Sequence, residues 1–131
     1  MLLVDCGVKA NIIRCLLKRD VEVIRVPWDY DFNGLEFDGL FISNGPGDPE
    51  AVEGTYSQVE KILGQVPVFG ICLGHQMIAK AAGAAIEKLK FGHRGGNHPV
   101  MNLLTGRVEI TAQNHGFGLV FPSLGELVPE L

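Results

Sequence analysis

The sequence predicts an α/β fold with an open, mostly parallel sheet and helices on both faces. Short apolar runs alternate with amphipathic segments along the first 83 residues, and turns rich in glycine or proline separate them. The chain has 131 residues, of which 47% are hydrophobic and 20% are charged. This composition is sufficient for one domain with a buried core.

The first elements follow from local patterns. Leu2–Cys6 is a short apolar run before a glycine, as expected of a buried strand. In Asn11–Arg19 the apolar residues recur at helical spacing, with basic residues on the other face. Val21–Val26 alternates apolar and charged residues, which predicts a second strand. Residues 27–38 begin with proline and are aromatic and acidic, so we expect a loop there.

The parallel pattern continues for two more strands. Gly39–Ser43 predicts a third buried strand, and Glu50–Leu63 predicts a moderately amphipathic helix. Val66–Ile71 predicts a fourth strand, and Gly74–Ala82 predicts a helix rich in small residues. This order of strands and helices is typical of a parallel sheet with crossover helices.

The pattern changes after residue 83. Ala85–Lys90 and Arg107–Thr111 look like strands, whereas residues 91–99 contain glycine, histidine and proline and are expected to form a loop. We interpret this part as an antiparallel extension of the sheet.

Charge and composition exclude several classes of function. The net charge of −4 argues against nucleic acid or a membrane surface as an electrostatic partner. No apolar run reaches the length of about 18 residues that a membrane span needs. Met1 is followed by an apolar, strand-like run and not by a basic leader, and three cysteines are too few for a disulfide framework. We therefore expect a cytoplasmic protein.

The sharpest chemical feature is the segment Gly-Ile-Cys-Leu-Gly at 70–74, which fits a nucleophile elbow with Cys72 as the nucleophile. Flanking glycines let strand and helix pass closely. The N-terminus of the next helix favours the thiolate, and the Leu73 N–H is placed to bind an oxyanion. The alternative is a buried structural cysteine in a tight turn.

A second feature is the segment Ser-Asn-Gly-Pro-Gly-Asp-Pro at 43–49, after the third predicted strand. Ligands of open α/β sheets bind at the carboxyl ends of strands. The segment is therefore a candidate second half of an oxyanion hole. A plain connecting turn is also possible, and so is a phosphate loop, although the lysine and hydroxyl residue that end a Walker sequence are absent.

Histidines offer a possible base. His115 lies in Gln-Asn-His-Gly-Phe at 113–117, after the last predicted strand, and is either a base for Cys72 or a loop histidine that orders its own turn. The four histidines (His75, His93, His98 and His115) are spaced like no zinc pattern, so we expect no metal site.

Together these motifs resemble class I glutamine amidotransferases, and more narrowly the small, glutamine-hydrolysing subunit or domain of carbamoyl-phosphate synthetase. The resemblance covers nearly the whole chain in the same order. It rests on the segments at 5–9, 26–28, 43–49, 70–76, 90–99 and 111–117.

The resemblance implies that the Cys72 thiolate attacks glutamine and forms a γ-glutamyl thioester, while the N–H groups of Gly45 and Leu73 hold the oxyanion. The implied glutamine site consists of Gly45, Gly47, Leu73, Gln76, Asn114, Gly116 and Phe117. The ammonia would pass to a large synthetase subunit or domain, where bicarbonate and ATP yield carbamoyl phosphate for arginine and pyrimidine synthesis. No cofactor is implied for this chain, since ATP and Mg²⁺ act in the partner.

The chain departs from the family in one respect. The family's catalytic histidine and glutamate belong to a His-Pro-Glu segment, whereas the His-Pro of this sequence, at His98–Pro99, is followed by Val100. The family's separate N-terminal domain is also missing. We therefore expect residues 1–131 to be a partial, C-terminally incomplete amidotransferase domain that alone hydrolyses glutamine very slowly or not at all.

Two other hypotheses for the function remain open. The chain could be a catalytically incomplete paralogue that binds glutamine or a synthetase subunit without turnover. It could also be a cysteine hydrolase of the same α/β type that uses His115 as its base.

Overall fold

The structure, a computed structural model, describes residues 1–120; residues 121–131, the end of the expected domain 1–131, lie outside the described part. The elements in chain order are β1 (Leu2–Asp5), α1 (Ala10–Leu17), β2 (Ile24–Pro27), β3 (Leu40–Ile42), η1 (Pro49–Val52, a 3₁₀ helix), α2 (Glu53–Ile62), β4 (Val68–Gly70), α3 (Leu73–Ala81), β5 (Ile86–Met101) and β6 (Val108–Leu119).

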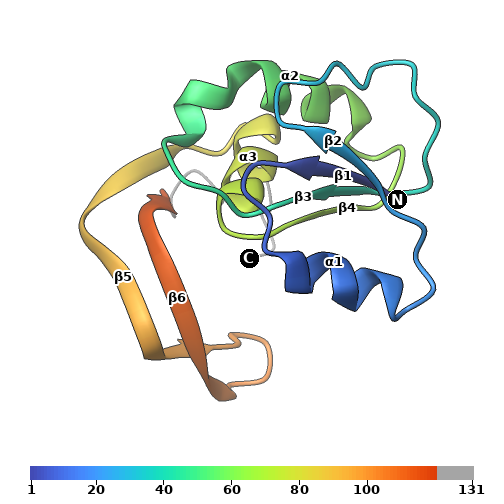
Figure 1. Ribbon diagram of the computed structural model, residues 1–131. Helices are drawn as coiled ribbons and strands as arrows, with labels where there is room; N and C mark the ends of the chain where they lie inside the picture. Colours follow the sequence, from blue (N-terminus) through green and yellow to red (C-terminus); the bar gives the residue numbers. More distant parts are fainter. Residues whose placement is uncertain (121–131) are drawn as a thin grey trace.

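The first four strands form one parallel sheet in the order β2-β1-β3-β4. Helix α1 lies on one face of this sheet, and α2 and α3 lie on the other (Figure 1). The α/β class, the parallel sheet and the helices on both faces are thereby confirmed. None of the helices in residues 1–120 is long and apolar enough to cross a membrane.

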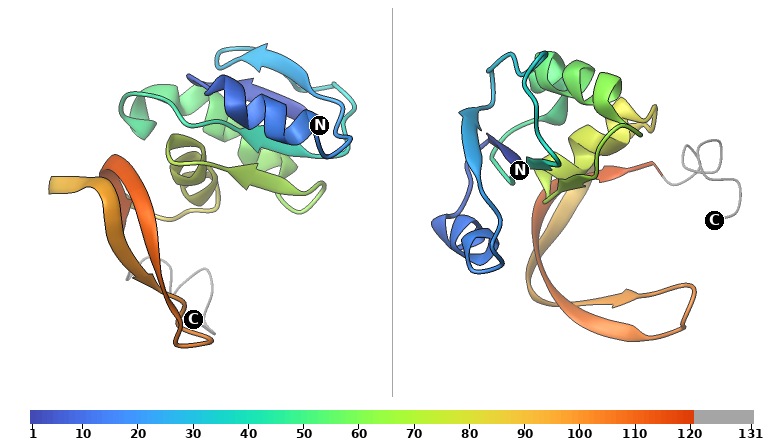
Figure 2. Two further views of the ribbon diagram at one scale, coloured as in Figure 1. Left: turned by 60° about the horizontal axis from the view of Figure 1, so that its bottom comes forward. Right: turned by 90° about the vertical axis from the view of Figure 1, so that its right-hand side faces the viewer.

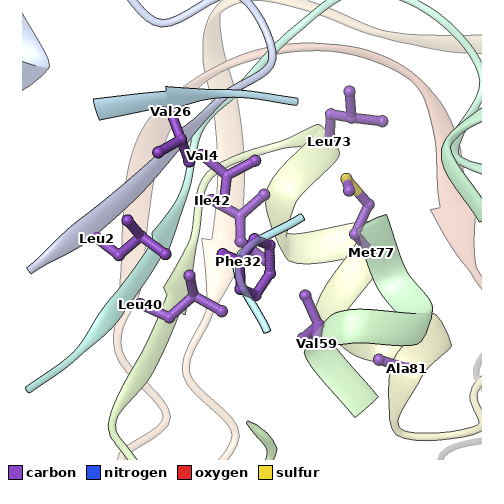
Figure 3. Packing of buried hydrophobic residues seen from close by; sticks show 10 residues of the cluster. All are labelled: Leu2, Val4, Val26, Phe32, Leu40, Ile42, Val59, Leu73, Met77 and Ala81. Carbon is purple, nitrogen blue, oxygen red and sulfur yellow. The ribbon is translucent and has the colours of Figure 1, made fainter. Parts of the chain in front are cut away.

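The core lies between the sheet and the α2–α3 layer. Alternate residues of each strand face this layer, as the pleat of a strand requires. Ten buried side chains form the cluster shown in Figure 3: Leu2, Val4, Val26, Phe32, Leu40, Ile42, Val59, Leu73, Met77 and Ala81. Leu3 and Phe41, on the opposite face of the sheet, are also buried. Burial on both faces explains why β1 and β3 are continuous apolar runs.

The expectation of a loop in the glycine-rich segment is wrong. Residues 91–99 are not a loop, because β5 continues through them and pairs antiparallel with β6, with register shifts between Lys88 and His93 and between Gly95 and His98. The expected strand Arg107–Thr111 likewise extends to Leu119. The shifts absorb the irregular residues, which is why the pattern lacked a simple alternation.

The hairpin is also not an extension of the main sheet. Strands β5 and β6 form a separate two-stranded sheet. It is a long, curved ribbon that projects away from the layered part (Figure 2). Its base is held at α3, where Gln76 Nε2 donates to the Phe117 carbonyl oxygen at 2.9 Å.

The carboxyl ends of the parallel strands meet at one edge of the sheet. At this edge Asp5 organises the loop between β1 and α1, because its Oδ1 accepts the N–H groups of Gly7 and Val8 at 2.9 and 2.8 Å. Its Oδ2 accepts from Arg25 Nε of β2 at 2.7 Å. Burial alone would raise the pKa of Asp5, but these hydrogen bonds and the Arg25 charge outweigh it and lower the pKa below its ordinary value of 3.8.

The Asp5 interactions predict an acid-dependent loss of stability. A carboxyl whose pKa is lowered by folding stabilises the native state above its ordinary pKa of 3.8, and this contribution is lost as the pH falls through the lower folded value. We expect Asp5→Asn to destabilise the chain at pH 7, with the difference from wild type shrinking below about pH 4. Urea denaturation between pH 2.5 and 7 measures this difference.

Asp38→Asn is the matched control for Asp5→Asn, because Asp38 is exposed and makes no hydrogen bond within residues 1–120. We expect its midpoint to follow that of wild type at every pH. A constant gap between Asp5→Asn and wild type over the whole range would contradict the assignment of the ionised carboxylate.

Candidate active site

Cys72 sits at a sharp turn between β4 and α3. It is the N-cap residue of α3, with φ 50° and ψ −107°, and it is half-buried. A positive φ is strained for a residue with a side chain, and such strain concentrates at functional sites. The elbow expected from the sequence is therefore present in its geometry.

Two glycines allow this turn. A Cβ at Gly74, on the first turn of α3, would lie 2.1 Å from the Ile42 carbonyl oxygen of β3. A Cβ at Gly70 would lie 2.5 Å from the carbonyl carbon of Gly74. Real Cβ contacts do not reach these distances. Only glycine at both positions lets α3 begin against the ends of β3 and β4, with Cys72 above them.

The sulfur of Cys72 faces the hairpin. Its Sγ lies 3.7 Å from the Asn114 carbonyl oxygen of β6, at hydrogen-bond distance for a thiol. The cap of α3 thus supplies the thiol, and β6 supplies its neighbouring backbone. Two residues that the resemblance assigns to the site, Cys72 and Asn114, are brought together from positions 42 residues apart.

Backbone N–H groups that could hold an oxyanion lie on two elements. Leu73 is the first residue of α3, so its N–H has no partner within the helix. The N–H of Gly45, in the loop after β3, makes no hydrogen bond with any group in residues 1–120. Ile42 of β3 lies opposite Gly70 of β4, so both groups follow the carboxyl ends of adjacent strands.

The loop after β3 approaches the loop after β1 very closely. A Cβ at Gly45 would lie 1.9 Å from the Cys6 carbonyl oxygen, so the site requires glycine. Gly47 has φ +103° and open space around it. Asp48 then caps η1 by accepting the Glu50 N–H at 2.9 Å. The loop is thus held against Cys6 at Gly45 and capped at Asp48.

The remaining residues of the implied glutamine site lie on α3 and the end of β6. Gln76 is only 6% exposed, and its amide donates to Phe117. It therefore fastens β6 to α3 through its side chain. Gly116 and Phe117 are half-buried in β6. Gln76 thus has a structural task in addition to the implied contact with substrate.

His115 does not pair with Cys72 in this arrangement. Its Nδ1 lies 2.8 Å from the Phe117 carbonyl oxygen, and its Nε2 lies 2.9 Å from Gln113 Oε1 and 3.3 Å from His93 Nδ1. Both ring nitrogens are engaged by groups other than the sulfur. The geometry argues against His115 as the base and favours an ordering role, although within strand β6 and not in a loop.

The other histidines are also away from the sulfur. His75 is exposed on α3, and within residues 1–120 no imidazole lies within hydrogen-bond distance of Cys72 Sγ. His98 Nε2 is buried without a partner in the described residues. Residues 1–120 contain no cluster of three histidine, cysteine, aspartate or glutamate side chains arranged for a metal ion.

The remaining cysteines differ from Cys72. Cys15 is exposed on α1, whereas Cys6 is half-buried at the end of β1. Burial, followed by the nearby Asp5 charge, raises the pKa of the Cys6 thiol to about 11. Cys6 therefore remains a thiol at neutral pH and is a poor nucleophile.

Two residues of this region had no role assigned from the sequence. Asp5 shapes the loop after β1, and Ser43, fully buried after β3, bonds to that loop. Their motifs were visible as segments 5–9 and 43–49. No local pattern shows, however, that these segments touch, since their contact depends on the sheet order.

The fold and this site define the class of protein. The sequence profile of the family described as glutamine amidotransferase class-I matches residues 2–127, and the chain belongs to that family. A solved structure from Thermoplasma acidophilum, of a putative GMP synthase subunit, superposes with a TM-score of 0.71 at 28% identity, covering 91% of this chain and 65% of that one.

More particular similarity is to carbamoyl phosphate synthase proteins. The chain is 52% identical to the arginine-specific small chain of Saccharomyces cerevisiae, over 89% of this chain and 30% of that protein. It is 48% identical to the small chain of Fusobacterium nucleatum, over 100% and 37%. It is also 51% identical to the multifunctional protein ura1 of Schizosaccharomyces pombe, over 100% and 6%. The chain thus spans about a third of the small chains and a small part of the multifunctional protein.

The elbow predicts opposite effects for two glycine-to-alanine changes in helices. Alanine is the better helix former at both positions. Gly74→Ala would place a Cβ 2.1 Å from the Ile42 oxygen, whereas Gly54 on α2 has nothing within 4 Å of its Cβ position. We expect Gly74→Ala to lower the free energy of unfolding by about 1–3 kcal/mol or more.

Gly54→Ala, the matched control, should leave stability unchanged or raise it by up to about 1 kcal/mol. Urea denaturation of both variants measures the difference. Equal stability of the two variants would show that α3 does not begin against β3 as described.

Proposed function

We propose that this chain provides the nucleophile, the oxyanion hole and part of the glutamine site of a glutamine-hydrolysing amidotransferase that supplies ammonia for carbamoyl phosphate synthesis. One observation carries the proposal: Cys72 lies at a strained elbow, at the N-terminus of α3, beside two adjacent strand ends. Family membership and the similarity to carbamoyl phosphate synthase small chains support it.

The reaction proceeds in two stages. The Cys72 thiolate attacks the side-chain amide carbon of glutamine, an S–C bond forms, and negative charge develops on the amide oxygen. The N–H groups of Leu73 and Gly45 stabilise this charge. The C–N bond then breaks, and the nitrogen leaves as ammonia with one added proton. Water finally attacks the γ-glutamyl thioester, which releases glutamate and restores the thiol.

Glutamine hydrolysis requires proton transfers, and the groups available for them limit the turnover that residues 1–120 can support. The leaving nitrogen needs a proton, and the attacking water must lose one, which is general acid–base work. Within the described residues no imidazole is in reach of the sulfur. By resemblance, a His-Pro-Glu segment does this work, and the printed sequence contains none. We infer that the chain alone turns glutamine over slowly at best.

The wider context follows from the same resemblance. L-glutamine is the substrate, and the ammonia is consumed by a synthetase large subunit or domain. That partner uses ATP and Mg²⁺, while this chain needs no cofactor of its own. We further propose a cytoplasmic location. Neither nucleic acid nor a membrane is a partner in this proposal.

A glutamine-like affinity label tests the nucleophile. The chloroketone L-2-amino-4-oxo-5-chloropentanoate should alkylate Cys72 with saturable kinetics, and glutamine should protect it. Cys15 is exposed and Cys6 stays a thiol below about pH 11, so the assay uses a Cys15→Ser background at pH 7.5. We expect one label per chain by intact mass, and none within the same time after Cys72→Ala.

Calorimetry with glutamine, together with a glutaminase assay, separates the alternatives. Binding without turnover, with Cys72 unlabelled by the chloroketone, would favour the non-catalytic paralogue. Steady glutaminase activity of the purified chain, abolished by Cys72→Ala, would overturn the inference that further groups are needed. Labelling that is not saturable and not prevented by glutamine would refute a glutamine site at Cys72.

A further inference from the structure

Ser43 joins the two loops behind the proposed oxyanion hole. Its side chain is fully buried at the end of β3. The Cys6 N–H donates to Ser43 Oγ at 2.9 Å, and the Ser43 hydroxyl donates to the Asn44 carbonyl oxygen at 2.8 Å. Since the hydroxyl has a single hydrogen, these two contacts fix its direction. The group thus connects the loop after β1 to the Asn44–Gly45 peptide.

This contact determines how the Asn44–Gly45 peptide is oriented. A trans peptide is planar, and its C=O and N–H point in opposite directions. No cis peptide bond occurs in residues 1–120. When Ser43 holds the Asn44 oxygen on one side, the Gly45 N–H is kept on the other side, where no described group accepts it. Rotation of the peptide would break the Ser43 hydrogen bond.

The loop after β1 also fixes the position of this peptide. The Cys6 carbonyl is so close to Gly45 that a Cβ there would lie 1.9 Å from its oxygen. Cys6 therefore contacts the peptide through its carbonyl and holds Ser43 through its N–H. The Asp5 carboxylate, which accepts the Gly7 and Val8 N–H groups, organises this same loop.

We propose that Ser43 is a positioning residue for catalysis, whose hydroxyl orients the Asn44–Gly45 peptide so that the Gly45 N–H serves the oxyanion. The role rests on the proposed function of the Cys72 site. Ser43 touches neither the sulfur nor, in this proposal, the substrate. Its effect is confined to steps in which negative charge develops on a carbonyl oxygen.

Acylation of Cys72 by the γ-thiophenyl ester of L-glutamate tests this role. Acylation by this ester develops an oxyanion, and its good leaving group reduces the need for a general acid. In the Cys15→Ser background, we expect Ser43→Ala to slow acylation about 10- to 100-fold. This decrease should not exceed the decrease in rate that follows removal of a complete oxyanion donor. The ester concentration that gives half-maximal acylation should change far less than the maximal acylation rate, both measured in a single turnover.

Alkylation of Cys72 by iodoacetamide distinguishes a positioning role of Ser43 from a merely structural one. A structural defect at the elbow would slow alkylation as well as acylation. This displacement occurs at a saturated carbon and develops no carbonyl oxyanion. We expect the same alkylation rate in Ser43→Ala and wild type. If Ser43→Ala slows alkylation as much as acylation, Ser43 only maintains the fold of the elbow, and the proposal fails.

Thr55→Val is the matched control. Thr55 is also buried, and its hydroxyl donates to the Trp28 carbonyl oxygen at 2.6 Å, in a contact between α2 and the loop after β2. We expect both rates to be unchanged in this variant. If Ser43→Ala fails to fold, Ser43→Thr and Ser43→Val form a pair of equal shape that differs in the hydroxyl alone.

The outcomes separate the two proposals. Absence of acylation in the otherwise unchanged chain contradicts the proposed function itself. Acylation at equal rates in wild type and Ser43→Ala, or in the Ser43→Thr and Ser43→Val pair, overturns the role of Ser43 alone. Faster acylation of Ser43→Thr than of Ser43→Val, with equal alkylation, supports it.

Discussion

The site depends on one steric constraint: the first turn of α3 packs directly against the end of β3. The absence of a side chain at Gly74 allows this approach, since a Cβ would lie 2.1 Å from the Ile42 oxygen. The sharp turn at Cys72, with its positive φ, lies directly before this contact. Because β3 and β4 are adjacent, the start of α3 and the loop that contains Gly45 follow neighbouring strand ends. The position of Cys72 and of the Leu73 N–H, one of the two candidate oxyanion donors, is thus tied to this contact between backbones.

Around this contact, hydrogen bonds hold the backbone groups of the site in place. Asp5 and Ser43 organise the two loops on one side, while Gln76 holds β6 on the other. Such an arrangement suits a site that stabilises an oxyanion, because preorganised N–H groups need no rearrangement during the reaction. In the proposed reaction two tasks are separate: residues 1–120 position the Cys72 thiol, and proton transfer is assigned to groups that they do not bring to the sulfur.

Local patterns were sufficient for the layered part of the fold. Leu2–Cys6 and Gly39–Ser43 were recognisable because strands buried on both faces are continuous apolar runs. The same reasoning failed at residues 91–99, where glycines and register shifts interrupt the alternation of a paired strand. It also assigned the hairpin to the main sheet, since nothing local distinguishes strands that join a sheet from strands that pair only with each other.

The sequence by itself determined the elbow at Cys72, because that turn needs only a residue between close glycines at a strand–helix junction. Tertiary structure decided which groups surround it. Asn114 contacts the Cys72 sulfur, Ser43 contacts Cys6, and His115 contacts His93 of the paired strand. Each of these contacts joins residues that are distant in sequence. Sheet order and strand register fix such contacts, and neither is encoded in a local motif.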